Sequence, residues 1–547
     1  MVGCVQVDLV WVGLTMRHFM RLIPCWIVFV GLIFSFTQGS SVSAANALLL
    51  PAGFIDEVAY GGLLAPRAFA FLPDGRVLAV ERGDVTSTNG NLASIRVFKN
   101  GALLSTAAYI VNVCGDSERG LLGIAVDPNF VSNGYIYIYY TRQSITGIPC
   151  ATNTFSNGIV TGIATGPRNR ISRLTMTGDI ANNELILIDS ILSEHGNHNG
   201  GDLHFGADGY LYASTGDAGV SWTSPHTGTL NGKIIRILPT LTGYDTTGNP
   251  YDLASGAVSC ATIAPAAPAN LPGPCKEIFA KGFRNPFRFT MQPTLFNIPG
   301  SDAPFVGDVG QSTWEEVDQV QAGGDYGWPV REGFCPLGQV CSPPYQSGGY
   351  QNPIYAYLHD NDLSSAIIGG DFYIGGAQYP AQYSNNYFFA EFERGFIARL
   401  IYNPNTQQWT RPVPDFASGG IGIVGLKRGP DGNLYYVAAT SLSSRIDSIH
   451  RIRYVDPANA APPRNYFTTT TTPTLTWNQI TWAIRYQVQV AMNSSFSGAA
   501  IYQAGSNLTI TLPPQGNGLY YYRVAACSTA LSCGAWSATE TFIIAVP

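Results

Sequence analysis

A polar, glycine-rich segment from Glu194 to Asp202 holds the residues best suited to acid–base chemistry. It reads Glu-His-Gly-Asn-His-Asn-Gly-Gly-Asp and stands just before a predicted strand at Phe205–Thr215. An imidazole exchanges its proton near neutral pH, so a histidine fixed at a strand end, such as His198, can take the proton of an alcohol. A lone histidine in a loop is more often a surface or hydrogen-bonding residue. The segment therefore identifies a candidate base.

Two further polar segments follow along the chain. Lys281–Arg288 contains Arg284, whose guanidinium could stabilise a developing oxyanion, bind a carboxylate through two hydrogen bonds, or form an ion pair at a strand edge. Gly307–Val317 and Gly323–Pro329 gather carboxylates and tight turns. Hard oxygen ligands of this kind suit calcium, although acidic turns are commonly only solvated.

The elements that must position these residues are predicted to be short strands. An Asp-Gly or Asn-Gly turn precedes a strand of alternating aromatic and aliphatic residues. The unit recurs at Pro73–Val80, Asn133–Ile138, Asp208–Ala213 and Pro430–Val437. Convincing helical periodicity is rare, so the repeat predicts four-stranded blades arranged radially. The region Phe54–Tyr454 has room for six blades of about 60 residues, with loop insertions at Ser144–Arg168 and Thr242–Pro274. The predicted fold class is all-β, a six-bladed β-propeller followed by a small β-sandwich.

A compositional break marks the second, smaller domain. Residues 456–473 are rich in proline and threonine, and we expect them to link a propeller at 46–455 to a module at 474–547. The module has short alternating strands, an early Trp477 and a tyrosine-rich strand at Tyr520–Val524. This spacing resembles a fibronectin type III sandwich. We expect a spacer, or a contact to a surface or a carbohydrate, without chemistry of its own.

The N-terminus is predicted to be a signal peptide, residues 1–45. Arg17 and Arg21 precede an apolar run at Trp26–Phe36, and small residues follow as far as Ala45. The run is shorter than the roughly 20 apolar residues that a spanning helix needs, which disfavours an uncleaved membrane anchor. We therefore expect the mature chain to be secreted, periplasmic or at the cell surface, with no membrane span.

Export makes disulfides the expected state of the cysteines. Cleavage near Ala44 removes Cys4 and Cys25 and leaves eight. A zinc site is disfavoured because the sequence has no Cys-x-x-Cys. Short spacings predict the pairs Cys260–Cys275, Cys335–Cys341 and Cys527–Cys533, which leaves Cys114 for Cys150.

The charge balance excludes two classes of partner. The formal net charge is -6 and only 12% of the residues are charged. Neither value gives a basic surface for nucleic acid or for an anionic membrane. We expect neither partner.

Four short motifs occur in an order and spacing shared with a known family. They are Glu118–Ala125, His198–Gly201, Gly282–Pro286 and Asp325–Pro329. Together they resemble the soluble quinoprotein glucose/sorbosone dehydrogenases, whose relatives include aldose sugar dehydrogenases and hedgehog-interacting proteins. The resemblance runs from about Gly53 to Tyr454. It implies a calcium-dependent enzyme that oxidises a sugar or a related polyol by hydride transfer to pyrroloquinoline quinone (PQQ).

The resemblance also implies roles for individual residues. His198 becomes the general base, and Arg284 and Asn285 lie at the quinone, with Arg284 helping to polarise its reacting oxygen. Glu118 stands where the glucose enzymes carry a glutamine near substrate and cofactor. Arg394 matches an arginine that clamps the carboxylates of the cofactor.

Calcium ligands come from the same resemblance. Gly310 and Gln311 match backbone carbonyl ligands of a catalytic calcium, and Glu316 with Tyr326 matches a structural calcium site. One departure stands out, because the family's cofactor-binding lysine, expected in a Tyr-Lys-Gly context, is replaced by Ile374. Losing that cation should weaken the binding of a tricarboxylate.

Two other functions stay open. A non-catalytic, calcium-stabilised binding propeller of the hedgehog-interacting type is favoured by Ile374 and by the appended module, whereas His198, Arg284 and Asn285 favour the enzyme. A calcium-dependent propeller hydrolase such as a lactonase would share the fold, since fold alone does not fix chemistry. The enzyme would need two partners, a small sugar substrate and an external electron acceptor.

Overall fold

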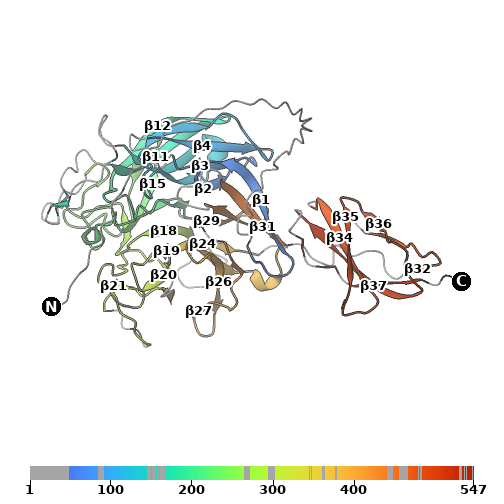
Figure 1. Cartoon of the computed structure of the whole chain (residues 1–547). Coiled ribbons are helices and arrows are strands. Elements are labelled where there is room, and N and C mark those ends of the chain that lie inside the picture. Colours follow the sequence, from blue (N-terminus) through green and yellow to red (C-terminus); the bar gives the residue numbers. More distant parts are fainter. Residues whose placement is uncertain are drawn as a thin grey trace, which may run out of the picture. The chain divides into compact units, whose positions relative to one another are not determined.

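The structure is a computed structural model (Figure 1). It describes residues 48–83, 91–143, 150, 155–156, 159–160, 167–263, 271–293, 302–343, 345, 348–359, 364–375, 378–420, 422–439, 447–454, 466–477, 480, 483–528, 533–534, 536–537, 539–544 and 546. The predicted signal peptide lies outside the described residues. Within them, no helix is both long and apolar enough to cross a membrane.

Six antiparallel units of four main strands make up the propeller in the described part of the chain, which confirms the predicted fold class. Blade 1 contains β2 (Pro66–Phe71), β3 (Val77–Glu81), β4 (Asn91–Lys99) and β6 (Tyr109–Val113). Blade 2 contains β7 (Leu121–Val126), β8 (Tyr135–Arg142), β11 (Arg168–Thr177) and β12 (Ile180–Leu192). Blade 3 contains β13 (Leu203–Phe205), β14 (Leu211–Thr215), β15 (Lys233–Pro239) and β17 (Ile278–Lys281).

The remaining three blades follow in chain order. Blade 4 contains β18 (Pro286–Met291), β19 (Pro304–Asp308), β20 (Trp314–Gln319) and β23 (Tyr355–Leu358). Blade 5 contains β24 (Ile367–Tyr373), β25 (Asn386–Glu391), β26 (Phe396–Asn403) and β27 (Gln408–Thr410). Blade 6 contains β29 (Ile423–Arg428), β30 (Leu434–Ala438), β31 (Asp447–Tyr454) and β1 (Phe54–Leu63).

The blades close into a ring. The first strand of each blade contacts the first strand of the next, in the order β2, β7, β13, β18, β24 and β29, and β29 contacts β2 again. The antiparallel pairing of β1 with β31 completes blade 6 with the earliest strand of the propeller. Closure of this kind leaves few exposed strand edges. It also brings the ends of six strands, far apart in sequence, to one axis.

The turns between the first two strands of a blade explain why the predicted repeat folds as it does. In blade 3, Asp208 Oδ1 accepts the N–H of Tyr210 (3.1 Å) and Oδ2 accepts the hydroxyl of Tyr212 (2.9 Å). In blade 6, Asp431 does the same for Asn433 (3.1 Å) and for Tyr435 (2.8 Å). The carboxylate thus satisfies the turn and fixes the first aromatic of the next strand. The glycine of each turn has a positive φ, which residues with a side chain rarely adopt.

Apolar layers between neighbouring blades form the core. One layer joins Leu122 and Tyr137 of blade 2 to Leu203 and Ile235 of blade 3. Another joins Phe305 of blade 4 to side chains of blade 5. Burial of both faces of each sheet explains the hydrophobic composition of the strands.

The C-terminal strands form a separate sandwich with its own core. One sheet has the order β32 (Tyr466–Thr468), β38 (Glu540–Ile544), β37 (Gly518–Cys527), β34 (Arg485–Ala491) and β35 (Ala500–Gly505), and the other pairs β33 (Thr474–Thr476) with β36 (Thr509–Thr511). Leu475, Trp477 and Phe542 are among its buried core residues. Strand β32 lies in the range expected to be linker. The fibronectin type III assignment stays a prediction.

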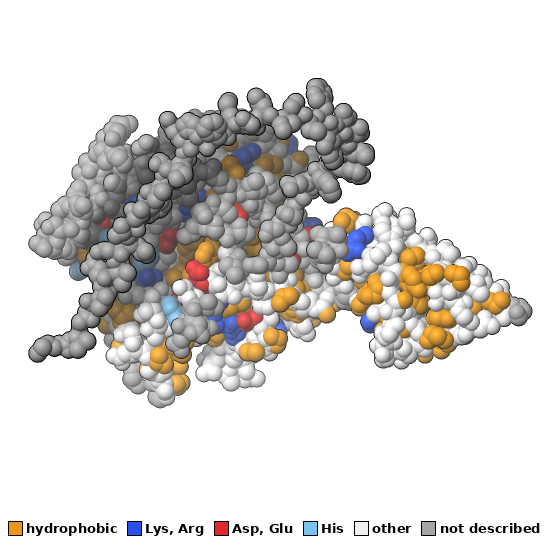
Figure 2. All heavy atoms as spheres, in the orientation of Figure 1, with side chains coloured by type: hydrophobic (Ala, Val, Ile, Leu, Met, Phe, Trp, Pro, Cys, Tyr) orange, Lys and Arg blue, Asp and Glu red, His pale blue; other side chains and the backbone are white. Residues whose placement is uncertain are grey.

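The surface of this sandwich carries few charges. In the space-filling view, its described atoms are mostly uncharged, with hydrophobic side chains interspersed (Figure 2). The large hydrophobic residues exposed there are Ile484, Met492, Ile501, Leu519 and Ile543.

All four predicted disulfides are present. They join Cys114 to Cys150, Cys260 to Cys275, Cys335 to Cys341, and Cys527 to Cys533. Three lie within the propeller region and one in the sandwich.

Candidate active site

His198 lies in the loop that enters blade 3. Its backbone has a positive φ of 51°, and its N–H donates to Glu118 Oε2 (2.8 Å). The next residue, Asn199, fixes the loop, because its Oδ1 accepts from Ser193 (2.6 Å) and its Nδ2 donates to the carbonyl of Gly196 (2.8 Å). The loop therefore holds the candidate base through specific hydrogen bonds and not through packing alone.

Asp217 orients the imidazole of His198. Its Oδ1 lies 2.7 Å from His198 Nδ1 and also accepts the N–H of Gly219 (2.7 Å), while its Oδ2 accepts Trp328 Nε1 (2.8 Å). Because this buried carboxylate serves as an acceptor throughout, it assigns the proton of the neutral imidazole to Nδ1 and leaves Nε2 as the basic nitrogen. A Cβ at Gly216 would lie 2.0 Å from the carbonyl oxygen of His198, so only glycine permits this approach.

Arg284 and Asn285 occupy the turn before β18. Asp308 accepts both of their backbone N–H groups, at 2.9 and 2.7 Å. Asn285 Oδ1 accepts the N–H of Gly200 (3.1 Å), which ties this turn to the His198 loop. Arg284 accepts the N–H of Asp217 through its carbonyl (2.8 Å). The structure thus brings Glu118, His198, Arg284 and Asn285 together.

The guanidinium of Arg284 is only partly satisfied. Its Nη1 donates to the carbonyl of Val309 (3.0 Å), and its carbon lies 5.6 Å from the ring centre of Trp328. Its buried Nε has no hydrogen-bond partner among the described residues. A buried donor in this state fits an anionic or carbonyl oxygen that comes with a ligand.

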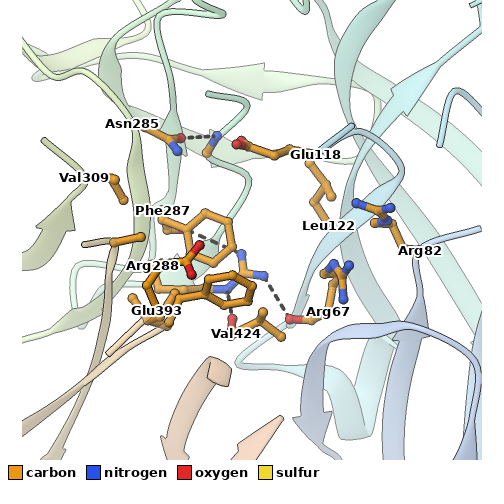
Figure 3. Close-up of a pocket in the computed structure, with 14 residues that line it drawn as sticks. Arg67, Arg82, Glu118, Leu122, Asn285, Phe287, Arg288, Val309, Glu393 and Val424 are labelled. Atoms are coloured by element: carbon orange, nitrogen blue, oxygen red, sulfur yellow. Dashed lines mark hydrogen bonds between the residues drawn. The ribbon is translucent and has the colours of Figure 1, made fainter. Parts of the chain in front are cut away.

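A cavity of about 190 Å³ opens beside these residues. Residues on or next to the first strand of every blade line it, so it lies on the axis of the ring (Figure 3). Its lining is Arg67, Arg82, Glu118, Leu122, Gly200, Asn285, Phe287, Arg288, Val309, Ala366, Ile368, Phe392, Glu393 and Val424. Apolar walls with a few converging polar groups are typical of a cofactor or substrate site.

Comparison with known proteins decides the family. The family model described as Glucose / Sorbosone dehydrogenase matches residues 63–444, which is most of the chain. The chain belongs to the glucose/sorbosone dehydrogenase family. This confirms the resemblance that the four motifs predicted.

Individual relatives are distant. The chain is 28% identical to the HIPL2 protein of Arabidopsis thaliana over 331 residues, covering 53% of this chain and 44% of that protein. It is 24% identical to the aldose sugar dehydrogenase YliI of Escherichia coli over 394 residues, covering 72% and 91%. The chain thus spans less than half the length of HIPL2.

Solved structures agree on the fold. A crystal structure titled as an oxidoreductase (glucose dehydrogenase) from Thermus thermophilus is similar with a TM-score of 0.53 and 26% identity, covering 73% of this chain and 100% of that one. The apo-form of the soluble aldose sugar dehydrogenase of Escherichia coli is similar with the same TM-score at 21% identity, covering 73% and 99%. At that identity the second likeness concerns the fold alone.

Arg394 lies apart from the cavity lining of this glucose/sorbosone dehydrogenase family member. Its N–H donates to Glu391, its Nη1 donates to the carbonyl of Leu358 (3.4 Å), and its guanidinium lies near the ring of Phe396. The preceding residue, Glu393, lines the cavity instead. The clamp role of Arg394 stays a prediction.

Ile374 is also absent from the cavity lining. It packs against the apolar cluster of blades 4 and 5 that contains Phe305 and Phe372. Any positive charge for a ligand in this cavity therefore has to come from other positions.

Three buried carboxylates cluster behind the Arg284 turn. Ligand atoms of Asp308, Glu316 and Asp318 lie within 4.8 Å of one another, and both oxygens of Asp318 lack a described hydrogen-bond partner. Burial, together with repulsion from the neighbouring carboxylates, raises the pKa of Asp318 and of Glu316 well above their ordinary values. Burial raises the pKa of Asp308 to about 7, against the N–H groups that it accepts. A hard divalent cation such as calcium fits this donor set.

The other predicted calcium ligands have these positions. Gly310 and Gln311 begin the loop between β19 and β20, where Glu332 Oε1 accepts the N–H groups of Gln311 (2.7 Å) and of the next three residues. A Cβ at Gly310 would lie 1.7 Å from the carbonyl of Trp314, so the loop requires glycine there. The hydroxyl of Tyr326 donates to the carbonyl of Gln319 (2.8 Å).

Several residues of this site were given no role from the sequence. Asp308 and Arg288 lie in the segments Gly307–Val317 and Lys281–Arg288, which the sequence analysis singled out, whereas Asp217, Asp318, Arg67 and Arg82 were missed. Two of these arginines stand inside otherwise apolar strands, as in Pro-Phe-Arg-Phe-Thr around Arg288. A charge in such a strand was the available signal, because buried charges are rare without a partner.

Proposed function

We propose that this chain is a quinoprotein dehydrogenase that oxidises a CH–OH group of a sugar or a related polyol. The observation that carries the proposal is the His198–Asp217 pair beside the axial cavity. Membership of the glucose/sorbosone dehydrogenase family supports the same reaction class. When bound, PQQ supplies a two-electron acceptor for the hydride that leaves the carbinol carbon.

His198 performs the proton chemistry in this proposal. Its Nε2 accepts the proton of the substrate hydroxyl, so the alcohol becomes a carbonyl as its C–H bond is broken. Asp217 keeps the proton on Nδ1 and stabilises the imidazolium that forms. Glu118 holds the backbone of His198 and lies at the cavity, where it can also contact the substrate.

Arg284 and Asn285 hold the cofactor in this proposal. The unpartnered Nε of Arg284 is the fitting donor for an oxygen that gains negative charge. Asn285 lines the cavity, and its position is fixed by Asp308 and Gly200. Arg394 would contribute from the turn between β25 and β26.

Calcium would serve at two places. Carbonyl groups of Gly310 and Gln311 would hold an ion next to the cavity-lining Val309, and Glu316, with Tyr326 nearby, would hold a structural ion together with Asp308 and Asp318. Such an ion would neutralise the carboxylate cluster and fix Asp308, which supports the turn of Arg284 and Asn285. We also propose that the mature chain works outside the cytoplasm, which its four disulfides support.

The test is reconstitution of the purified chain with calcium and PQQ, followed by reduction of an artificial electron-acceptor dye with a panel of aldoses and polyols. We expect dye reduction that requires PQQ, calcium and one class of substrate. Samples without PQQ or with a chelator are the controls. PQQ binding without turnover of any substrate would overturn the enzyme and leave a binding protein.

A second function has support as well. The chain is similar to the HIPL2 protein, a name that states no enzymatic activity, and Ile374 replaces the family's cofactor-binding lysine. Both observations agree with a non-catalytic, calcium-stabilised binding propeller of the hedgehog-interacting type. In that case the chain would keep the propeller fold without redox activity. The chain incubated with calcium and PQQ would then neither bind PQQ nor reduce the dye.

A further inference from the structure

Three arginines of the axial cavity have no described role in the proposed reaction. Arg67 lies on β2, Arg82 follows β3, and Arg288 lies on β18. Their residues are only 3%, 1% and 4% exposed, yet all three line the cavity. In Figure 3, Arg67 and Arg288 lie on the side of the cavity opposite Asn285 and Glu118.

The hydrogen bonds of these arginines go to backbone carbonyls. Arg288 donates to Val424 (3.2 Å), to Arg67 (2.9 Å) and to its neighbour Phe287 (3.4 Å). Arg67 Nη1 donates to Pro66 (3.0 Å), and Arg82 Nη1 donates to Ser117. Carbonyls satisfy hydrogen bonds without supplying negative charge.

Other N–H groups of these arginines have no partner in the described part of the chain. Among the described residues, Arg67 Nη2, Arg82 Nε and Arg82 Nη2 are buried without a hydrogen-bond partner, and none of the three arginines belongs to an ion pair. Burial lowers the pKa of Arg67 to about 9 and that of Arg82 to about 10, whereas the carboxylate of Glu118 acts in the opposite direction on both. Glu118 and Glu393 also line the cavity, and Asp202 acts on Arg288. None of these carboxylates forms an ion pair with the three arginines, so an anionic ligand can still neutralise the buried positive charge.

The apolar side chains that line the cavity between the arginines indicate what the rest of the anion must be. Phe287, Phe392, Leu122 and Ile368 line the cavity, and the guanidinium carbon of Arg288 lies 4.6 Å from the ring centre of Phe287. Apolar and aromatic walls favour a flat, unsaturated body. Guanidinium groups bind carboxylates through two parallel hydrogen bonds, more specifically than lysine can.

We propose that Arg67, Arg82 and Arg288 form a binding site for the carboxylates of a flat aromatic polycarboxylate, which we call the arginine site. The arginine site supplies cations inside the cavity, whose lining includes neither Ile374 nor Arg394. It also sets the orientation of the ligand, with its carboxylates toward β2 and β18 and its opposite edge toward Asn285. Identifying this ligand with PQQ, a tricarboxylate, rests on the proposed function.

The experiment measures binding by isothermal titration calorimetry to the calcium-loaded chain, without substrate or dye. The probes are PQQ, benzene-1,3,5-tricarboxylate, and its neutral analogue benzene-1,3,5-trimethanol. The variants are Arg67→Met and Arg82→Met, which keep much of the side-chain length without charge. Arg173→Met is the matched control, because Arg173 is also buried and held by carbonyls, those of Thr240 (2.5 Å) and Leu241 (2.7 Å), but lies outside the cavity lining.

We expect the wild type to bind both carboxylates and not the neutral analogue. Each cavity variant should bind them about 10- to 100-fold more weakly, the usual effect of losing a charge-assisted hydrogen bond. Arg173→Met should bind them as the wild type does. Equal affinity of wild type and cavity variants would overturn the arginine site even if PQQ binds, and the proposed function would then stand alone.

Two further outcomes separate the claims. Binding of the tricarboxylate but not of PQQ would support the arginine site and remove the proposed cofactor. A wild type that binds neither carboxylate would overturn the arginine site. If the methionine variants do not fold, two measurements replace them. Arg82→Lys, which loses the planar guanidinium, should bind both carboxylates more weakly than the wild type does. In the wild type, only the charged probe, and not its neutral analogue, should raise the melting temperature.

Discussion

The imidazole Nδ1 of His198 lies 2.7 Å from Oδ1 of Asp217, although the residues are 19 positions apart. The contact follows from the first hairpin of blade 3, because His198 precedes β13 and Asp217 follows β14. In an antiparallel pair, the residues before one strand and after the other meet at the same end of the sheet. One hairpin thus positions both the base and the carboxylate that orients it.

Replacing His198 by glutamine should remove the base and keep the cavity. Glutamine keeps much of the size and hydrogen-bonding capacity of histidine, but it cannot accept a proton near neutral pH. Turnover of the reconstituted enzyme should fall roughly 10²- to 10⁴-fold, while PQQ affinity, measured by titration, should barely change. A variant that oxidises sugars at the wild-type rate would show that another group is the base.

Asp217→Asn should slow the reaction through His198. The amide cannot accept from Nδ1, Gly219 and Trp328 as the carboxylate does, and it offers N–H donors of its own, so the imidazole loses its tautomer and orientation. We expect a rate loss of about 10²- to 10⁴-fold and an altered pH profile of kcat. The pH profile separates this role from simple destabilisation. An unchanged profile, with only a lower melting temperature, would make Asp217 a structural residue.

The parts of the fold that depend on local sequence could be predicted. The Asp-Gly turns carry their own hydrogen bonds at Asp208 and Asp431, so each hairpin can be recognised within a few residues. The three short-spaced disulfides are local in the same sense. Neighbouring motif residues, such as Arg284 and Asn285, could also be assigned together.

The parts of the fold and of the site that depend on closure of the propeller ring could not be predicted from the sequence. Arg67 and Arg288 contact each other through a hydrogen bond between residues 221 positions apart, which exists only because blades 1 and 4 face one axis. Asp308 reaches the Arg284 turn from the neighbouring strand, and its two carboxylate neighbours lie on β20. Residue types indicated some of these positions, but a one-dimensional pattern gives no distance across a propeller.

Arg284→Lys should impair binding and rate together. Lysine replaces a planar group that contacts Val309 and Trp328 by a flexible point charge, and its single nitrogen cannot span the carbonyl of Val309 and a ligand as the three guanidinium nitrogens can. We expect weaker PQQ binding, by about tenfold or more, together with slower turnover. PQQ affinity and turnover are both measured on this variant, in parallel with His198→Gln. Loss of turnover with unchanged PQQ affinity would place Arg284 away from the cofactor.

Cutting the chain between the propeller and the sandwich should leave the proposed activity intact. Every residue assigned to the site precedes Tyr454, the last residue of β31, and the sandwich has a core of its own. A chain ending at residue 460 should fold, and its turnover with PQQ should stay within about twofold of the full chain. The melting curve of the truncated chain is the control. A folded truncation without activity would show that the sandwich contributes to the site.

Calcium removal should make stability depend on pH through the cluster of Asp308, Glu316 and Asp318. Burial raises the pKa of Asp308 from 3.8 to about 7, so the folded chain binds this proton more tightly than the unfolded chain does. By linkage, stability in a chelator should fall as the pH rises from about 4 through about 7, where the folded cluster must ionise against its own repulsion. Bound calcium should abolish this loss of stability. The melting temperature with calcium should therefore exceed that with chelator by a margin that grows with pH to several degrees. In Asp318→Asn, one charge fewer should flatten the dependence in chelator and weaken the calcium effect. Asp415→Asn, at a partly buried ion pair with Arg411 outside the cluster, should leave the pH dependence and the calcium effect unchanged. Identical curves with calcium and with chelator at every pH would show that these carboxylates hold no ion.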